Sequence, residues 1–228
     1  MSVVLVTGAN RGIGFEAVKQ LRALGHVVYL GARDTERGNE AAARTDARFV
    51  QLDVTDDASV ARAIQDIAVT EGRLDVLVNN AGIQEFDPVD GPLALRGFNT
   101  NAVGVVRVTE AALPLLRRSN SPVVVTVSSS AGSFWAVTNP GRPEYHLTNA
   151  VYAASKAAAT MLTVQYAKAN PGMRINAIEP GYTATDMTAA FDGGQPVEEA
   201  ARAVVKLATI GSDGPTGTLQ DAEGVMNW

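Results

Sequence analysis

The chain has 228 residues, a net charge of −5 and 46% hydrophobic residues, which is enough apolar side chain for one sizeable core. It contains no cysteine, so disulfides, thiolate catalysis and cysteine-ligated metal sites are excluded, and we expect no metal site. No basic stripe supports nucleic-acid binding. The first residues lack a basic leader, and no apolar run reaches the roughly 18 residues of a membrane span. We therefore expect a cytoplasmic protein that binds neither nucleic acid nor membranes.

Short β-branched segments alternate with longer alanine-rich segments along the whole chain. The predicted strands cover residues 3–7, 27–32, 48–52, 74–79, 123–128, 174–179 and 217–220. The predicted helices cover residues 13–24, 36–45, 58–71, 98–118, 151–169 and 197–210. Several of these strands are apolar at consecutive positions, which is typical of strands buried on both faces. The alternation predicts one α/β domain over residues 1–228, a doubly wound (Rossmann) parallel sheet of about seven strands with helices on both faces.

Three segments that contain glycine or proline interrupt this pattern after strands, at residues 84–92, 134–147 and 187–196. In a doubly wound sheet, ligands bind beyond the carboxyl ends of the strands, where such segments lie. We therefore expect them to form the walls of a pocket. Segment 134–147 is predicted to be a loop insertion before the next helix, and segment 187–196 a substrate loop.

A glycine-rich turn follows the first strand and opens the first helix. Its spacing is Gly-x-x-x-Gly-x-Gly, in Thr7-Gly-Ala-Asn-Arg-Gly-Ile-Gly14. Such glycines allow a tight turn and a close approach of the backbone to a pyrophosphate, which the helix amino terminus attracts. The candidate phosphate-binding residues are Gly8, Asn10, Arg11, Gly12, Ile13 and Gly14. A glycine turn without a ligand is the structural alternative.

The end of the second strand bears on the choice between NAD and NADP. An acidic residue there would bind the ribose hydroxyls of NAD, whereas arginine accommodates the extra phosphate of NADP. Gly31 occupies the place of that acid, and Arg11, Arg33 and Arg37 surround it. Asp34 is discordant, because it could partly neutralise Arg33. The pattern favours NADP(H), and ordinary surface arginines are the alternative.

Tyr152 and Lys156 stand four residues apart in a stretch of helix-forming residues, so a helix places them on one face. A free tyrosine has a pKa near 10 and transfers protons poorly at neutral pH. A nearby ammonium favours the phenolate and is expected to lower that pKa. The pair is a candidate proton-transfer device, and a surface tyrosine beside a solvated lysine is the alternative.

These motifs, taken together, resemble the short-chain dehydrogenase/reductase family over nearly the whole chain. The motifs are the glycine turn, Asn79-Asn-Ala-Gly82, the serines at 128–130, the Tyr152–Lys156 pair and Pro180-Gly181. The segments 32–38, 51–54, 74–83 and 180–187 look most like the NADPH-dependent carbonyl reductase branch. The resemblance implies reversible hydride transfer from NADPH to a ketone or aldehyde.

The resemblance also implies a set of catalytic residues. Tyr152 matches the general acid, and Lys156 matches the lysine that lowers its pKa and binds the nicotinamide ribose. The family's serine spacing, anchored on Gly132, selects Ser129 to polarise the carbonyl, with Ser130 as the alternative. Asn101 matches the asparagine that supports a proton-relay water. Its alternative is an asparagine that competes for backbone hydrogen bonds in a helix.

Further matches concern the bound cofactor, which the resemblance identifies as NADPH. Besides the glycine turn, the two arginines, Tyr152 and Lys156, the implied cofactor-binding residues are Asp53, Val54, Asn80, Ala81, Gly82, Pro180, Gly181, Thr183 and Thr185. Asp53 and Val54 would meet the adenine, and Thr185 the nicotinamide carboxamide. The alternatives are a simple turn at Asn79–Asn80 and a helix N-cap at Thr185.

One departure from the family lies between Ser129 and Tyr152, which are 23 positions apart, longer than is typical of the family. The surplus falls in segment 134–147, which would either roof the pocket or cover the sheet edge. It lies beside the helix through which family members often dimerise, so both a homo-oligomer and a monomer stay open. The expected partner is a small, uncharged carbonyl compound. The alternative function is a non-catalytic, NADP(H)-binding redox-sensing regulator.

Overall fold

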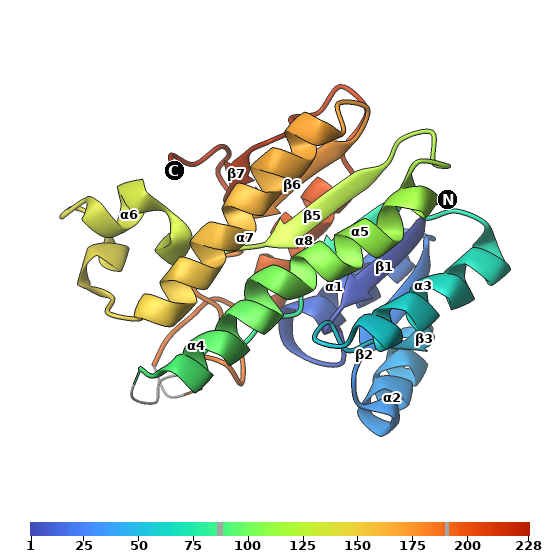
Figure 1. Cartoon of the computed structure of the whole chain (residues 1–228), viewed down its shortest axis with the longest axis horizontal. Coiled ribbons are helices and arrows are strands. Elements are labelled where there is room, and N and C mark those ends of the chain that lie inside the picture. The colour runs from blue at the N-terminus through green and yellow to red at the C-terminus, as the bar shows by residue number, and fades with distance from the viewer. Residues whose placement is uncertain (86–88, 190–191) are drawn as a thin grey trace.

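The computed structural model describes residues 1–85, 89–189 and 192–228. Its centre is a seven-stranded sheet in the order β3-β2-β1-β4-β5-β6-β7, in which every neighbouring pair is parallel (Figure 1). The strands are β1 Val3–Thr7, β2 Val27–Ala32, β3 Arg48–Gln51, β4 Val76–Asn79, β5 Val123–Val127, β6 Arg174–Ile178 and β7 Leu219–Gln220. The predicted fold class is confirmed, and each strand agrees with its prediction to within two residues.

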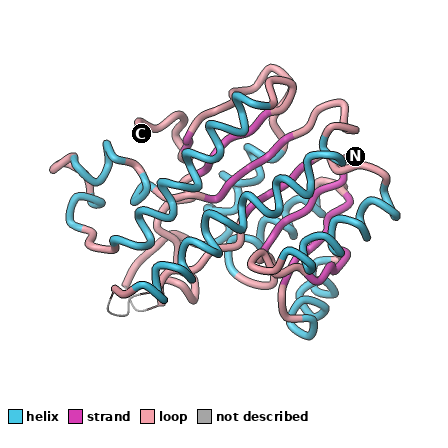
Figure 2. The backbone as a smooth tube through the Cα atoms, in the orientation of Figure 1, coloured by secondary structure: helices cyan, strands magenta, loops and turns pink. Residues whose placement is uncertain are grey.

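Helices cover both faces of the sheet (Figure 2). They are α1 Gly12–Ala23, α2 Thr35–Thr45, α3 Asp57–Glu71, α4 Gly91–Phe98, α5 Gly104–Leu116, α6 Phe134–Thr138, α7 Ala150–Ala169 and α8 Val197–Ala208. Successive side chains of a strand point to opposite faces. Val4 and Val6 of β1 accordingly pack in the core with α1 and α8, whereas Val3 and Leu5 pack in the core with α3 and α5. Both faces of β1 are thus buried, which explains its unbroken apolar sequence.

The helix predicted to begin at Phe98 begins earlier. Helix α4 starts at Gly91 because the Asp90 carboxylate accepts a hydrogen bond from the Leu93 N–H at 2.7 Å, and Pro92 suits a first turn. A π-helical stretch, Asn99–Val103, then joins α4 to α5. Part of the predicted 84–92 interruption is therefore helical, and residues 86–88 of it lie outside the described residues.

Segment 134–147 is more regular than the predicted loop, because it contains α6 and a 3₁₀ helix, Pro143–His146. The carboxyl-terminal residues hold it in place. The Ser133 hydroxyl accepts a hydrogen bond from the Ala136 N–H at 3.1 Å and donates one to the Asn227 carbonyl at 2.9 Å. The Trp135 N–H donates to the Trp228 carbonyl at 2.8 Å. Contacts this distant in sequence could not be anticipated from local propensity.

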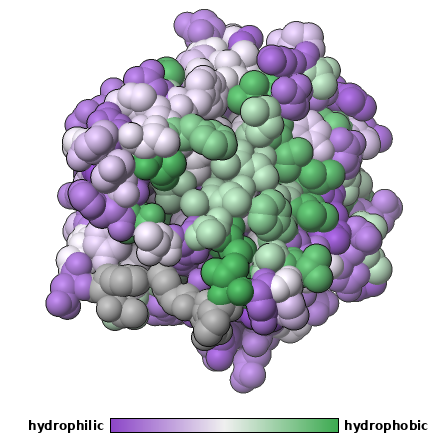
Figure 3. All heavy atoms as spheres, turned by 60° about the vertical axis from the view of Figure 1, so that its left-hand side comes forward, coloured by the Kyte–Doolittle hydropathy of each residue, from purple (hydrophilic) through white to green (hydrophobic). Residues whose placement is uncertain are grey.

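Hydrophobic surface gathers on the side of the molecule where α4 and α6 lie (Figure 3). The exposed large hydrophobic residues of α4, α6, α7 and the segments next to them include Leu95, Val103, Phe134, Tyr145, Leu147 and Met161. Association of copies through this side stays a prediction. In the described part of the chain, no helix has the length and apolar character needed to cross a membrane.

Candidate active site

The glycine-rich turn lies where β1 passes into α1, next to the end of β4. Gly8 and Gly12 have φ values of 62° and 59°, in the left-handed region that favours glycine. A side chain at Gly8 would have its Cβ 2.8 Å from the Ala81 Cα. Asn80 donates hydrogen bonds to the carbonyls of Thr7 (2.8 Å) and Gly8 (3.1 Å). Asn80 and Ala81 therefore hold the turn, in addition to any contact that they make with an adenosine.

The amino terminus of α1 is suited to an anion. Arg11 precedes this helix and makes no side-chain capping bond, whereas Asp34 and Asp56 cap α2 and α3. The first N–H groups of α1 thus lack the side-chain acceptor that the other two helices have. The half-buried residues Asn10 and Ile13 also belong to the turn. This arrangement fits a cofactor pyrophosphate.

Three arginines were expected to lie around the adenosine phosphate. Arg33 and Arg37 are exposed beyond the end of β2. Asp34 caps α2 by accepting from the Arg37 N–H at 3.0 Å, and its carboxylate lies 3.9 Å from the Arg37 guanidinium. Its ion pair is therefore with Arg37, and the expected neutralisation of Arg33 is not observed. Arg11 instead reaches across to Asp186, with 2.9 Å between Nη1 and Oδ2.

Asp53 and Val54 follow β3 at the same edge of the sheet. The Asp53 carboxylate accepts hydrogen bonds from the Thr55 N–H at 2.9 Å and from the Thr55 hydroxyl at 2.7 Å. These bonds fix the carboxylate in a tight turn. Val54 is buried against Gly104, where an added Cβ would lie 3.0 Å from the Val54 side chain. Their expected contacts with adenine stay predictions.

The segment after β6 lies across the site from α1. Gly181 has a φ of 86°, and the Thr183 hydroxyl donates to the Gly181 carbonyl at 2.8 Å. Gln195 donates to the carbonyl of Pro180 and so holds the segment from the other side. Thr185 lies 3.7 Å from the position of a Cβ at Gly12. No helix starts at Thr185 in the described residues, so the N-cap alternative does not hold.

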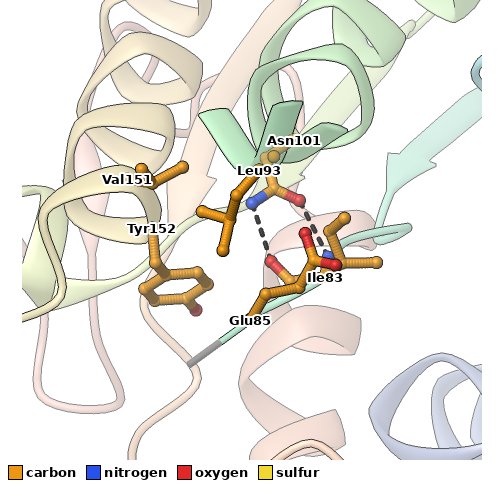
Figure 4. A pocket seen from close by; sticks show the side chains of 7 residues that line it. Ile83, Glu85, Leu93, Asn101, Val151 and Tyr152 are labelled. Carbon is orange, nitrogen blue, oxygen red and sulfur yellow. Dashed lines mark hydrogen bonds between the residues drawn. The ribbon is translucent and has the colours of Figure 1, made fainter. Parts of the chain in front are cut away.

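Asn101 lies in the π-helical stretch and is buried. Its side-chain oxygen accepts from the Ile83 N–H at 2.8 Å, and its amide nitrogen donates to the Ile83 carbonyl and the Ser155 hydroxyl, both at 2.9 Å (Figure 4). The side chain thus pairs with the loop after β4. Because Asn101 lies in a π-helical stretch, the helix departs from α geometry at this residue. Such π-bulges are frequent at functional sites.

The three serines after β5 have different surroundings. The Ser128 hydroxyl is buried against α7, 2.6 Å from the Thr160 hydroxyl and 3.1 Å from the Lys156 carbonyl. The Ser130 side chain lies beside the carboxylates of Glu144 and Glu179 and favours a lower pKa of both. The half-exposed Ser129 lies close enough to Tyr152 to lower the pKa of its phenol. Ser129 is therefore the serine that the fold brings to the phenol, and Ser130 is engaged by carboxylates.

Tyr152 lies at the amino end of α7 and lines a small pocket (Figure 4). The remaining lining residues come from the loop after β4, from α4, from the π-helical stretch and from α7, and include Ile83, Glu85, Leu93 and Asn101. Residues 134–147 are not among them; as described above, that segment packs against the carboxyl terminus. Glu85 belongs to segment 84–92, which was predicted to form a pocket wall, and it forms an ion pair with Arg96 at 3.2 Å.

The ionisation of the Tyr152–Lys156 pair differs from the prediction. The pKa of Tyr152 is raised to about 12, mainly by burial and also by the charge of Glu179, against a lowering effect of Ser129. Burial lowers the pKa of Lys156 to about 8, against an opposing effect of Glu179. The Lys156 ammonium lies 5.7 Å from the Tyr152 ring centre and donates to the Val127 carbonyl at 2.8 Å. The expected lowering of the Tyr152 pKa was therefore wrong for this structure, because burial raises that pKa and Lys156 is not among the groups that shift it.

Two carboxylates beside the serines, the buried Glu144 and the partly buried Glu179, were not predicted from the sequence. Glu179 stands directly before Pro180, and its carboxylate accepts hydrogen bonds from the N–H groups of Ser130 and, at 2.7 Å, Gly181. Glu144 comes from the 3₁₀ helix Pro143–His146 and forms a two-pronged ion pair with Arg142 at 2.9 and 3.0 Å. The only available signal was the position of Glu179 at the carboxyl end of an apolar strand.

A sequence profile described as short chain dehydrogenase matches residues 2–195. The chain belongs to this family. The (−)-isopiperitenone reductase of Mentha piperita is 34% identical over 93% of this chain and 94% of its own. The (+)-neomenthol dehydrogenase of Capsicum annuum is 32% identical over 93% of both.

Among solved structures, the NADPH-bound carbonyl reductase from chicken fatty liver is similar to this chain with a TM-score of 0.88. It is 29% identical, and the match covers 100% of this chain and 99% of that one. The predicted family is confirmed, and this neighbour agrees with the carbonyl reductase branch. The chain is therefore an oxidoreductase of a family that uses nicotinamide cofactors.

Proposed function

We propose that this short-chain dehydrogenase transfers a hydride from NADPH to the carbonyl of a ketone or aldehyde, reversibly. The observation that carries the proposal is the proximity of Ser129 to Tyr152, which is close enough for Ser129 to lower the pKa of the phenol. Tyr152 also lines a pocket with Asn101, at the sheet edge that carries the glycine turn. Two hydroxyl groups that lie close together can both hydrogen-bond one carbonyl oxygen and stabilise the charge that develops on it during reduction.

Each residue of the site has its own role in the proposed reaction. NADPH supplies the hydride when it is bound, with its pyrophosphate at the amino terminus of α1. Ser129 and Tyr152 stabilise the negative charge that develops on the carbonyl oxygen. Tyr152, whose pKa is about 12, is protonated at neutral pH and donates its proton to that oxygen. Lys156 binds the nicotinamide ribose, and Asn101 holds the loop that closes this side of the pocket.

A preference for NADPH over NADH rests on the end of β2. Gly31 leaves no carboxylate for the ribose hydroxyls, and the Arg33 guanidinium forms no ion pair with any described residue. Arginine can meet a phosphate dianion with two parallel hydrogen bonds. The NADPH carried by the chicken carbonyl reductase supports the same choice.

The proposal is tested by following NADPH oxidation at the nicotinamide absorbance across a panel of ketones and aldehydes, with NADH in parallel. We expect turnover in the wild type, and a loss of at least about 10²-fold in kcat for Tyr152→Phe with NADPH binding retained. Tyr145→Phe, which changes an exposed tyrosine, is the matched control and should keep wild-type activity. Tight NADPH binding without turnover of any carbonyl would instead support a redox-sensing regulator.

A further inference from the structure

The pocket beside Tyr152 is small and largely apolar (Figure 4). Its volume is about 10 Å³, which is close to what one water-sized group needs. Ile83, Leu93 and Val151 supply apolar side chains to its wall. The pocket therefore has room for one hydroxyl-sized group of a substrate, and the rest of the molecule lies outside it.

Asn101 has no N–H group left for a substrate. Its amide nitrogen donates to the Ile83 carbonyl and to the Ser155 hydroxyl, both at 2.9 Å. Its side-chain oxygen accepts from the Ile83 N–H at 2.8 Å. The phenol of Tyr152 is engaged by the carbonyl oxygen in the proposed reaction. Among the polar side chains that line the pocket, Glu85 is the one still able to bind a second group of the substrate.

The two carboxylate oxygens of Glu85 have different surroundings. Oε1 accepts a hydrogen bond from the Arg96 guanidinium at 3.2 Å. Oε2 is buried and accepts no hydrogen bond from any residue that the structure describes. A buried oxygen of this kind has lost its contact with water without gaining a donor, which is unfavourable. Glu85 thus brings to the pocket an acceptor that a ligand can satisfy.

The group that satisfies this acceptor is a hydrogen-bond donor, so a hydroxyl and an ammonium are the candidates. Arg96 already provides one positive charge to Glu85. An ammonium would bring a second positive charge to the same carboxylate, and the two cations would repel each other. A hydroxyl supplies the donor without a charge, and its size matches the pocket. The chemistry of the pocket therefore favours a hydroxyl.

We propose that Glu85 is a substrate-binding residue, and that the substrate is an α-hydroxy ketone or aldehyde whose hydroxyl donates to the Glu85 Oε2. This role rests on the proposed function. Tyr152 and Glu85 line the same small pocket, so one substrate can reach both only if few bonds separate its carbonyl from its hydroxyl. An α-hydroxy carbonyl compound meets this condition.

The reaction itself is unchanged, and Glu85 makes and breaks no covalent bond. Reduction adds a hydride from NADPH to the carbonyl carbon and the phenolic proton of Tyr152 to the carbonyl oxygen. The hydroxy carbonyl compound and NADPH thus give a vicinal diol and NADP⁺, and a proton from solvent restores the phenol. Glu85 contributes by selecting which carbonyl compound lies against Tyr152.

The test compares ketones that differ by a hydroxyl in place of a methyl group, namely hydroxyacetone with butanone and α-hydroxyacetophenone with propiophenone. The measured quantity is the ratio of the two kcat/KM values in each pair. Because a hydroxyl also changes the reactivity of the carbonyl, the ratio of the wild type is compared with that of Glu85→Leu. We expect the ratio to fall by roughly 10- to 100-fold in Glu85→Leu, which is the effect of one hydrogen bond to a charged group.

Gln84→Leu is the matched control. It makes the same change from polar to apolar at the preceding residue, which the described lining of the pocket does not include, and it should keep the wild-type ratio. An unchanged ratio in Glu85→Leu overturns the proposal. An equal loss for both members of a pair also overturns it, because Glu85 would then have a purely structural role.

Glu85→Gln provides a second variant in case Glu85→Leu does not fold. Its amide oxygen can accept from Arg96, which turns the amide nitrogen, a donor, toward the pocket. We expect the ratio to fall in this variant too, by less than in Glu85→Leu. A wild-type ratio in Glu85→Gln would overturn the role of Glu85 as an acceptor.

Binding separates this role from the proposed function. If the wild type reduces no ketone, the proposed function fails, and saturation-transfer NMR with hydroxyacetone and butanone in the presence of NADP⁺ decides the role of Glu85. Weaker binding of hydroxyacetone to Glu85→Leu than to the wild type, with no such loss for butanone, would support it. Absent binding of hydroxyacetone to the wild type, or equal binding to both proteins, would overturn it.

Discussion

The choice between Ser129 and Ser130 can be tested with one pair of alanine variants. Ser129→Ala removes the hydroxyl that lies near Tyr152 and lowers the pKa of its phenol. In the proposed reaction this hydroxyl is one of two donors to the carbonyl oxygen. Removal of one such donor typically costs about 10²–10³ in kcat, which corresponds to about 2.7–4 kcal/mol. We expect a loss of that size in NADPH-dependent reduction, with NADPH binding unchanged.

Ser130→Ala is the matched control, since it removes the neighbouring hydroxyl. The Ser130 hydroxyl lies beside Glu144 and Glu179, and without it these carboxylates keep their contacts with Arg142 and with backbone N–H groups. We therefore expect a loss of about 1–2 kcal/mol of stability, measured by urea denaturation, and less than about a tenfold loss in kcat.

The two variants also differ in what they do to Tyr152. The Ser129 hydroxyl lowers the pKa of Tyr152, so Ser129→Ala moves that pKa still further above neutrality. The tyrosine stays protonated, and the loss of activity in Ser129→Ala should be the same at every pH between about 6 and 7.5. Equal losses in the two variants, or nearly wild-type turnover by Ser129→Ala, would refute the assignment.

The remaining predictions concern the cofactor and pH. Arg33→Ala should weaken NADPH binding by about tenfold or more and weaken NADH binding little, as measured by fluorescence titration. Equal losses for the two cofactors would show that Arg33 does not bind the extra phosphate of NADPH. Asp186→Asn should tighten NADPH binding by up to about fivefold, because it releases Arg11 from an exposed ion pair, and weaker binding would contradict this. The pKa of Lys156 is lowered to about 8, so reduction should be retained below that pH and lost above it, as a pH–rate profile would show.

Much of the fold was readable from local sequence patterns. Unbroken apolar strands, such as Val3–Thr7, and alanine-rich helices reflect burial on two faces and the 3.6-residue period, which act over a few residues. The alternation of the two elements then implies parallel strands, because the helix between two strands carries the chain back to the same end of the sheet. The glycine turn and the Tyr152–Lys156 spacing are also local. The prediction was wrong where one residue decides a helix start. It began the helix at Phe98 instead of Gly91, because the Asp90 N-cap was not recognised.

The site required contacts between segments far apart in the chain. Ser128, Ser129 and Ser130 are chemically identical, and their different partners come from α7, β6 and the 3₁₀ helix Pro143–His146. The spacing of Tyr152 and Lys156 suggested a lowered tyrosine pKa, because it accounts for the nearby charge but not for burial. Packing of the loops around them removes water and raises that pKa instead. The local sequence therefore identifies the reacting groups, whereas their surroundings in the folded protein determine their pKa values.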